Sequence, residues 1–152
     1  MLVTLRDVAE SDLLVFFEQQ REPEASRMAA FPARERDAFF AHWRTKVLGS
    51  AETTKQTIVV DGAVAGHIGS WGQGSERLVG YWIGKAYWGQ GVATAALAEF
   101  VATHETARPL RAFVAATNAG SVRVLEKCGF RRVGDPARGE DGVEELVMQL
   151  GA

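Results

Sequence analysis

The apolar residues in the first third of the chain follow an extended pattern once and a helical pattern twice. The stretch "LVTLRD" alternates apolar and polar side chains and predicts a strand over 2–7. Helical spacing predicts one helix over 11–20 and a second helix from Pro32 to Gly49. Residues 21–31, "REPEASRMAAF", have no clear period and are expected to form an irregular link.

In the middle of the chain the period changes to that of strands. Short apolar runs predict strands over 57–60, 63–71 and 77–84. Asp61 and Gly62 are a strong two-residue hairpin signal between the first two strands. This part is therefore expected to be a three-stranded antiparallel unit.

The last third of the chain mixes both patterns. Helices are expected over 90–103 and 118–128, and strands over 110–116, 129–134 and 143–150. The whole chain then has the order β-α-α-β-β-β-α-β-α-β-β. That order predicts an α/β fold built on one central mixed sheet.

Composition and charge narrow the class of protein. The chain of 152 residues (1–152) is expected to form one domain, and its net charge of −2 gives no overall basic field to attract nucleic acid. No apolar run approaches the roughly 20 residues of a membrane span, and "MLVTLRDVAE" does not resemble a signal peptide. We therefore expect a cytoplasmic protein with no nucleic-acid partner and no membrane partner.

The cysteine content of the chain also agrees with a cytoplasmic protein. Cys128 is the single cysteine of the chain, and no Cys/His cluster accompanies it. Neither a disulfide nor a metal site is expected. Cys128 is expected to be a small, buried apolar residue.

The stretch "WGQGVATAAL" places glycines where a helix begins. A helix N-terminus offers unpaired N–H donors, and glycine lets an anion approach the backbone because no Cβ stands in the way. The N–H groups from Gln90 to Thr94 would then hold a phosphate or pyrophosphate. Tight packing of the helix against the sheet is the alternative explanation of the same glycines.

Two familiar phosphate-binding loops fit this stretch poorly. A P-loop requires a lysine where the chain has Gln90. The dinucleotide-binding pattern G-x-G-x-x-G/A would begin at Gly89 and end at Thr94, but the small residue Ala93 comes one position early. A Rossmann-type nucleotide-binding enzyme is therefore kept only as an alternative.

Three motifs resemble the GNAT superfamily of acyl-CoA-dependent N-acetyltransferases, and more narrowly the branch that includes the ribosomal-protein N-terminal acetyltransferases. The pyrophosphate pattern Q/R-x-x-G-x-G/A falls on Trp88 to Ala93, with Gly91 matching and Trp88 replacing the usual Gln or Arg. "VGYWIGKAYWGQG" resembles the family's fourth strand and the loop after it. "NAGSVRVLEKCGF" resembles N-x-x-S-x-R-V-L-E-K-x-G-F, with matches at Asn118, Ser121, Arg123, Val124, Leu125, Glu126, Lys127, Gly129 and Phe130.

This resemblance implies acetyl transfer from acetyl-CoA to a primary amine by direct attack, with no enzyme nucleophile and no metal. It implies a GNAT-like fold whose mostly antiparallel sheet splays between the fourth and fifth strands, with pantetheine in the gap. The N–H of Ile83 would polarise the thioester carbonyl, and Ser121 would act as general acid. The residues expected to bind acetyl-CoA are Trp82, Ile83, Gly89, Gln90, Gly91, Val92, Ala93, Thr94, Asn118 and Ser121.

Two of these residues have a structural alternative. Asn118 either orients pantetheine or only caps the helix that it begins. Ser121 is either the general acid or only a small polar residue of that helix. Many GNAT enzymes use a tyrosine four residues before the motif's glycine. This chain has Leu125 there, which moves the acid's role to Ser121 or to solvent.

The general base and the acceptor site have weaker candidates. Glu76, before the fourth strand, is a candidate base, and His67 has a suitable intrinsic pKa. Glu24 and Arg27 lie in the link that is expected to line the acceptor pocket. The alternatives are a solvated turn carboxylate, a structural histidine and ordinary loop charges.

The sequence thus predicts an acetyl-CoA-dependent N-acetyltransferase, monomeric or homodimeric, whose acceptor is a protein N-terminal α-amine or a small-molecule amine. A non-catalytic acyl-CoA-binding module is the first alternative, because it needs the phosphate loop but no turnover. The Rossmann-type enzyme is the second.

Overall fold

One sheet with helices on both faces organises the chain. The computed structural model describes residues 1–29, 33–73, 75–138 and 142–151. Its strand order is β1-β2-β3-β4-β5-β8-β6, and β7 pairs with β8 outside this path. The strands are β1 (Val3–Asp7), β2 (Thr54–Val60), β3 (Ala63–Gln73), β4 (Glu76–Ile83), β5 (Leu110–Ala115), β6 (Arg131–Arg132), β7 (Ala137–Arg138) and β8 (Glu144–Leu150).

In the described part of the chain, five α-helices and two shorter helical turns connect the strands. A π-helical turn, η1, continues the third helix, and a 3-10 turn, η2, follows β4. Among the described residues, no helix is both long and apolar enough to cross a membrane. The helical elements are α1 (Asp12–Gln20), α2 (Pro23–Ala29), α3 (Arg36–His42), η1 (Trp43–Val47), η2 (Lys85–Tyr87), α4 (Val92–Thr103) and α5 (Ala119–Lys127).

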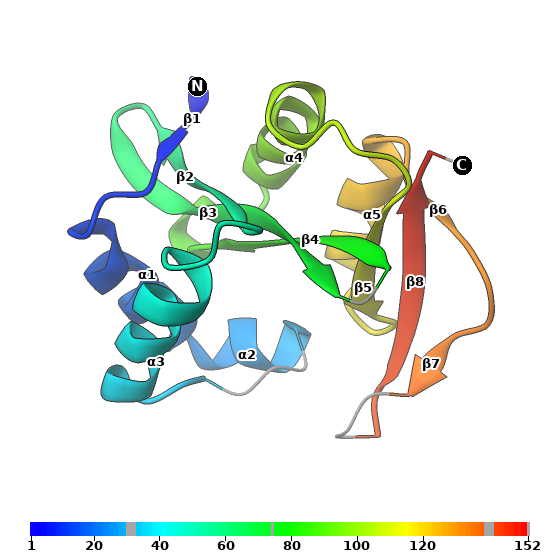
Figure 1. Cartoon of the computed structure of the whole chain (residues 1–152), viewed down its shortest axis with the longest axis horizontal. Coiled ribbons are helices and arrows are strands. Elements are labelled where there is room, and N and C mark those ends of the chain that lie inside the picture. Colours follow the sequence, from blue (N-terminus) through cyan, green and yellow to red (C-terminus); the bar gives the residue numbers. More distant parts are fainter. Residues whose placement is uncertain (30–32, 74, 139–141, 152) are drawn as a thin grey trace.

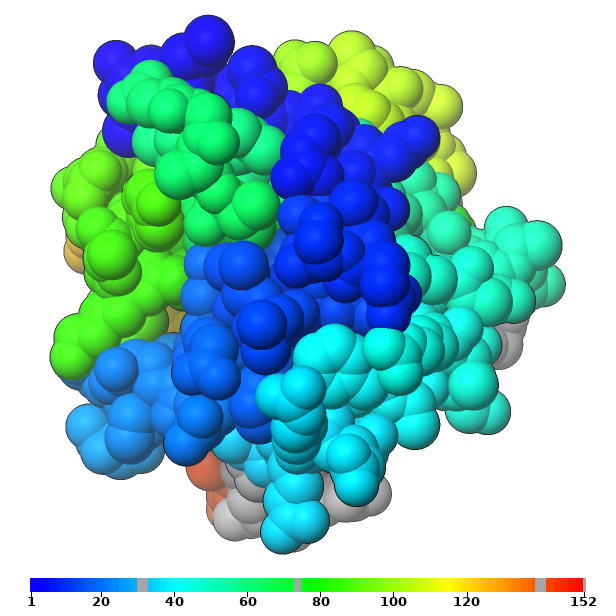
Figure 2. Space-filling model, turned by 90° about the vertical axis from the view of Figure 1, so that its left-hand side faces the viewer, coloured from blue at the N-terminus to red at the C-terminus, as the bar shows by residue number. Residues whose placement is uncertain are grey.

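The helices divide between the two faces of the sheet, and each face has its own core. Helices α4 and α5 lie on one face, and α1, α2 and α3 lie on the other (Figure 1). The α4 side buries Leu97 and Phe100 against strand residues such as Ile68. The α1 and α3 side buries Phe16 and Trp43 in a separate aromatic cluster. Figure 2 shows the N-terminal part of the chain, in blue to cyan, spread over one side of the molecule.

The sheet opens between β4 and β5. These two strands are parallel and pair only at Leu78 and Arg111, whereas the other strand pairs are antiparallel. The rest of β4, up to Ile83, runs away from β5 and leaves an unpaired edge (Figure 1). The predicted mixed, mostly antiparallel sheet that splays between its fourth and fifth strands is therefore confirmed.

Several predicted elements were wrong in detail. The expected irregular link contains a helix, α2, which begins at Pro23, because proline suits the first helical position, where its missing N–H is no loss. The next helix starts at Arg36, with Glu35 extended as its N-cap; Pro32, the predicted start, lies outside the described residues. Between the predicted strands 129–134 and 143–150, where we expected no regular element, lies the two-residue strand β7.

Candidate active site

The unpaired edge of β4 forms one wall of a cavity of about 350 Å³. The cavity is also lined by α2, by the loop before α4, by the first turn of α4 and by one side of α5 along its length. Most of the residues predicted to bind acetyl-CoA line it. They are Trp82, Ile83, Gly89, Gly91, Val92, Ala93, Thr94, Asn118 and Ser121.

The backbone of β4 presents alternate residues to this cavity. The N–H of Gly84 donates to the carbonyl of Ala65 at 2.8 Å, and Ile83 lies opposite Gly66. In an antiparallel ladder the bonded pairs alternate, so the backbone groups of Trp82 point to β3. Those of Tyr81 and Ile83 point away from β3, into the open edge.

The loop before α4 brings bare backbone to the cavity. Gly89 and Gly91 adopt φ angles of +74° and +80°, which side-chain-bearing residues rarely adopt. A Cβ built on either glycine meets no atom within 4 Å. Because α4 starts at Val92, the N–H groups of its first turn have no acceptor within the helix. The loop is thus shaped for close approach of an anion.

Trp88, the departure from the family pattern, ties this loop to the strand. Its indole Nε1 donates to the carbonyl of Ile83 at 2.9 Å. The side chain of Gln90 turns back to donate to the carbonyl of Ala86 at 3.0 Å. Gln90 does not contribute to the cavity wall, unlike its neighbours in the loop.

The start of α5 supplies the polar side chains of the cavity. The Oδ1 of Asn118 accepts from the backbone N–H of Ser121 at 3.2 Å, so Asn118 caps α5 and lines the cavity at once. The Oγ of Ser121 is hydrogen-bonded to the Tyr81 hydroxyl at 2.7 Å. Burial raises the pKa of Tyr81 to about 12, although the bond to Ser121 lowers it in part. Tyr81 is therefore a protonated phenol beside Ser121.

Sequence reasoning missed Tyr81. It looked for a tyrosine on the helix at Leu125, which is buried in the core. The available signal was alternation along β4, which places Tyr81 and Ile83 on one face and Trp82 on the other. That signal shows which face of the strand Tyr81 lies on, but not its hydrogen-bond partner, because Ser121 is 40 positions away in the chain.

A second, larger cavity of about 810 Å³ is lined mainly by residues of α3, η1, β2, β3 and β4. The two cavities share Ala29, Tyr81 and Trp82 as lining residues. They therefore meet at the end of β4. Phe39 and Trp43 are among the aromatic side chains of the larger cavity.

His67 lies in the wall of this larger cavity. Its ring is 4.7 Å from the ring of Phe16 and 4.8 Å from the ring of Trp43, between centroids. Its Nδ1 is buried and has no hydrogen-bond partner among the described residues. Burial, and then the charge of Lys55, hold the pKa of His67 well below its ordinary value. His67 is therefore a neutral imidazole and a weak base.

The remaining candidates for the general base and the acceptor site line neither cavity. They are Glu76, Glu24 and Arg27. Glu76 is ion-paired with Arg111 at 2.6 Å, at the start of β4. Seven extended residues, or about 23 Å, separate it from Ile83. Glu24 is paired with Lys85 at 3.0 Å and fixes α2 to the turn after β4. Arg27 is exposed on α2.

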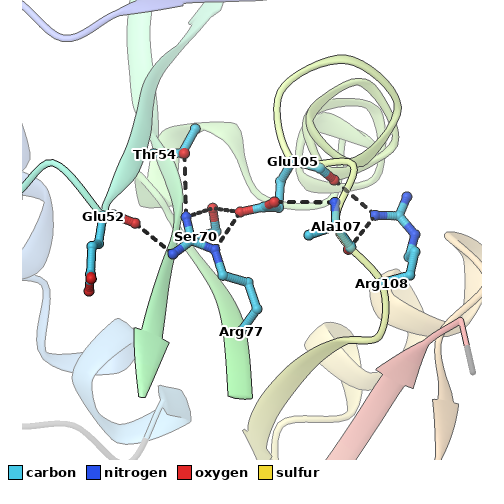
Figure 3. Close-up of polar contacts among 7 residues, drawn as sticks. All are labelled: Glu52, Thr54, Ser70, Arg77, Glu105, Ala107 and Arg108. Carbon is cyan, nitrogen blue, oxygen red and sulfur yellow. Dashed lines mark hydrogen bonds and ion pairs between the residues drawn. The ribbon is translucent and has the colours of Figure 1, made fainter. Parts of the chain in front are cut away.

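A partly buried ionic network lies beside the segment that leads into β2 (Figure 3). The Oε1 of Glu105 accepts from Ser70 at 2.5 Å and from the Nε of Arg77 at 2.7 Å. Burial raises the pKa of Glu105, but these two hydrogen bonds, the charge of Arg77 and the N–H of Ala107 together outweigh it, so the pKa is lowered. Arg77 also donates to the carbonyl of Glu52 at 2.6 Å. The network thus fixes the segment before β2, which lines the cavity.

No cluster of three metal-ligating side chains occurs within the part of the chain that the structure describes. Cys128 is half-buried, and its thiol lies 3.5 Å from the carbonyl of Thr94. Burial raises the pKa of this thiol, which makes the reactive thiolate scarcer. Its environment is that of a packing residue.

Comparison with known proteins identifies the family. The model of the acetyltransferase (GNAT) domain matches residues 3–131. No curated protein matches the chain.

Solved structures share the fold at low identity. A GNAT-family acetyltransferase from Bacillus anthracis is 16% identical, with a TM-score of 0.80, over 99% of this chain and 95% of that one. Spermidine N-acetyltransferase from Vibrio cholerae, in complex with CoA and spermine, is 14% identical with a TM-score of 0.81, over 97% and 94%. Aminoglycoside acetyltransferase AAC(6′)-Ib, in complex with coenzyme A, is 21% identical with a TM-score of 0.76, over 97% and 94%. Because the family model covers most of the chain, we conclude that this protein belongs to the GNAT acetyltransferases.

Proposed function

We propose that this protein transfers the acetyl group of acetyl-CoA to a primary amine by direct attack. The observation that carries the proposal is the meeting of two cavities at Tyr81 and Trp82, at the open end of β4. One cavity has a glycine-rich helix start suited to a pyrophosphate, and the other is large enough for an acceptor. Two substrates entering from opposite sides would meet at this point.

Acetyl-CoA is assigned to the smaller cavity. The N–H groups at the start of α4, beyond Gly91, would bind the pyrophosphate. The backbone of Tyr81 faces the open edge and would pair with pantetheine as a neighbouring strand does. The N–H of Ile83 faces the same edge, while its carbonyl accepts from Trp88. The solved spermidine and aminoglycoside acetyltransferases that share the fold hold CoA, which supports this assignment.

The reaction needs few groups from the protein. The amine nitrogen forms a bond to the thioester carbon, the C–S bond breaks, and the sulfur leaves as a thiolate. The new amide nitrogen gives up one proton to solvent, which balances the proton that the thiolate takes up. The N–H of Ile83 would stabilise the oxyanion. The hydroxyls of Tyr81 and Ser121 would supply a proton to the thiolate, because they lie together in the cavity wall.

The structure offers no strong general base near this point among the described residues. Glu76 is engaged by Arg111 at the other end of β4, and His67 is held neutral with a low pKa. We propose that the amine enters already neutral. At pH 7 roughly a tenth of an α-amine is neutral, compared with well under a thousandth of a lysine side chain.

An α-amine acceptor therefore suits the site best. The motif resemblance to the ribosomal-protein N-terminal acetyltransferases agrees, since those enzymes also acetylate an α-amine. A cytoplasmic location and a monomeric or homodimeric state belong to the same proposal.

The test is an acetyl-transfer assay with purified protein. Acetyl-CoA is mixed with α-amines, polyamines and lysine peptides, the free thiol is followed, and the products are identified by mass spectrometry. We expect thiol release that depends on the amine. Tight CoA binding without turnover on any amine would favour the non-catalytic module, and tight NAD binding without CoA binding would favour the Rossmann-type enzyme.

A further inference from the structure

The larger cavity has an excess of basic side chains. Among its described lining residues, Glu52 is the one acidic member. The basic members are Arg34, His42, Lys46 and Lys55. Burial and the neighbouring cations lower the pKa of His42, so the positive charge of the wall comes mainly from its lysines. Such a wall repels a ligand with several positive charges and attracts a negative one.

Lys55 is the basic residue built most deeply into this wall. It comes from β2, is partly buried, and its Nζ lies 4.8 Å from the centre of the Trp43 ring. No carboxylate among the described residues forms an ion pair with it. Burial lowers the pKa of Lys55 to about 8, so the ammonium is still mostly charged at pH 7. A partly buried cation without a counter-ion is an unfavourable arrangement that a bound anion would relieve.

The neighbouring strand makes room for this side chain. Gly69 lies directly opposite Lys55 on β3. A Cβ on Gly69 would come within 2.7 Å of both Cδ and Nζ of Lys55. The lysine therefore lies flat across β3, which holds its ammonium on the cavity side of the sheet.

The position of Lys55 suits a small acceptor. Lys55, Gly69 and Gly80 form one row across β2, β3 and β4. Two strand spacings put the Cα atoms of Lys55 and Gly80 about 10 Å apart. Gly80 directly precedes Tyr81, where the two cavities meet. The lysine stem spans part of this distance. One small molecule can therefore contact the ammonium of Lys55 and also reach the point where the two cavities meet.

We infer that this cavity selects primary amines that also carry an acidic group, such as a carboxylate, and that Lys55 binds that group. The inference rests on the proposed acetyl transfer and names its acceptor class. It separates this protein from the solved spermidine N-acetyltransferase, which holds spermine, a molecule with several positive charges.

The aromatic walls of the cavity do not contradict this inference. Aromatic rings attract cations, but the ring of Trp43 already has the ammonium of Lys55 beside it. Phe39, Trp71 and Trp82 remain as apolar walls for the carbon skeleton of the acceptor.

The test uses amines that differ only in charge. The first series is 4-aminobutanoate, 4-aminobutanamide and 1,4-diaminobutane. The second is the α-amides of L-glutamate, L-glutamine and L-lysine, in which the side chain alone sets the difference in charge. Each is assayed with acetyl-CoA and wild-type protein, with Lys55→Met, and with Arg132→Met as a control that removes an exposed charge outside both cavities. Circular dichroism checks that each variant is folded.

We expect the acidic member of each series to have the highest kcat/KM. Lys55→Met should lower that value about tenfold or more, as expected for a lost charge-assisted hydrogen bond, and should leave the neutral member nearly unchanged. Arg132→Met should change neither. Preference for 1,4-diaminobutane, or an unchanged preference in Lys55→Met, would overturn the inference and leave the acetyltransferase standing.

Absence of turnover with any amine would instead count against the proposed function. Binding then tests the inference separately, by calorimetry with the same amines and protein saturated with CoA. Tighter binding of the acidic members that is lost in Lys55→Met supports it. Equal binding, or no binding, overturns it.

Discussion

The hydroxyl of Tyr81 lies 2.7 Å from the Oγ of Ser121, so β4 and α5 are joined by a hydrogen bond beside the gap in the sheet. The two residues come from segments far apart in the chain, and both line the smaller cavity. In the proposed mechanism this pair takes the role that a helix tyrosine has in many GNAT enzymes, which is to protonate the departing sulfur.

Tyr81→Phe should lower kcat about a hundredfold, the usual size of a general acid's contribution. Ser121→Ala should have a smaller effect, because Tyr81 keeps its hydroxyl. The dissociation constant of CoA, measured by calorimetry, should stay nearly the same in both variants. An unchanged kcat in Tyr81→Phe would exclude the phenol as the proton donor.

The pH dependence gives an independent check on the same residue. Burial raises the pKa of Tyr81 to about 12, so its hydroxyl stays protonated through neutral and moderately alkaline pH. Loss of this proton should therefore cause no fall in rate between pH 7 and pH 10. A decline of kcat centred near pH 10 in wild type, absent in Tyr81→Phe, would contradict the buried position.

Gly91→Ala should weaken CoA binding by more than its effect on folding explains. Gly91 has a φ of +80°, and an added Cβ meets no protein atom within 4 Å. The variant should lose about 1 kcal/mol of stability from backbone strain alone. Any further loss of CoA affinity would come from a Cβ placed where the pyrophosphate approaches.

Gly62→Ala is the matched control. Gly62 has a φ of +86°, also meets no atom within 4 Å, and lies in the β2–β3 hairpin away from both cavities. Both variants should lose similar stability in urea unfolding, but CoA affinity should fall only in Gly91→Ala. Equal affinity in the two variants would mean that the loop does not hold the phosphate.

Local patterns in the sequence were enough to predict the glycine turn before α4 and the cap of α5. Gly91 supplies a left-handed backbone turn, and the side chain of Asn118 caps the helix that directly follows it. A short motif therefore contains what is needed to predict both. The strands were predicted for the same reason, since alternation is a local property. Helix α2 was missed because its few apolar residues, such as Ala25 and Met28, give too weak a period over seven residues.

Contacts between distant segments could not be predicted. Glu76 has the right chemistry for a base, but its partner Arg111 is on another strand. Lys55 was passed over because nothing near it in the sequence marks it as buried. Its environment is made by Gly69 and Trp43, which only the folded sheet brings to it.

Asp12→Asn should make the protein less sensitive to acid. Burial raises the pKa of Asp12, but hydrogen bonds from Arg6, from the N–H of Ala9 and from Thr57 outweigh burial and lower it to about 2. Because the folded pKa lies below the unfolded value of 3.8, the stabilisation is present above about pH 4 and is lost as pH falls towards 2. Its size is about 2 kcal/mol.

The measurement is urea unfolding at pH 7, 4 and 2.5 in wild type and Asp12→Asn. The variant should be less stable than wild type by about 2 kcal/mol at pH 7, and the difference should shrink as the pH falls. A difference that stays constant down to pH 2.5 would mean that Asp12 does not titrate in this range.

Gly69→Ala should disturb recognition of an acidic acceptor without removing any charge. The added Cβ would lie 2.7 Å from Nζ of Lys55, and the flexible lysine stem would move aside. Stability should change by less than about 1 kcal/mol, because the atoms displaced belong to the end of a flexible side chain. The KM for 4-aminobutanoate should rise, since the ammonium leaves its place on the sheet.

A double-mutant cycle decides whether the effect passes through Lys55: Gly69→Ala combined with Lys55→Met should be no worse than Lys55→Met alone. Additive effects on KM would show that Gly69 shapes the cavity by another route.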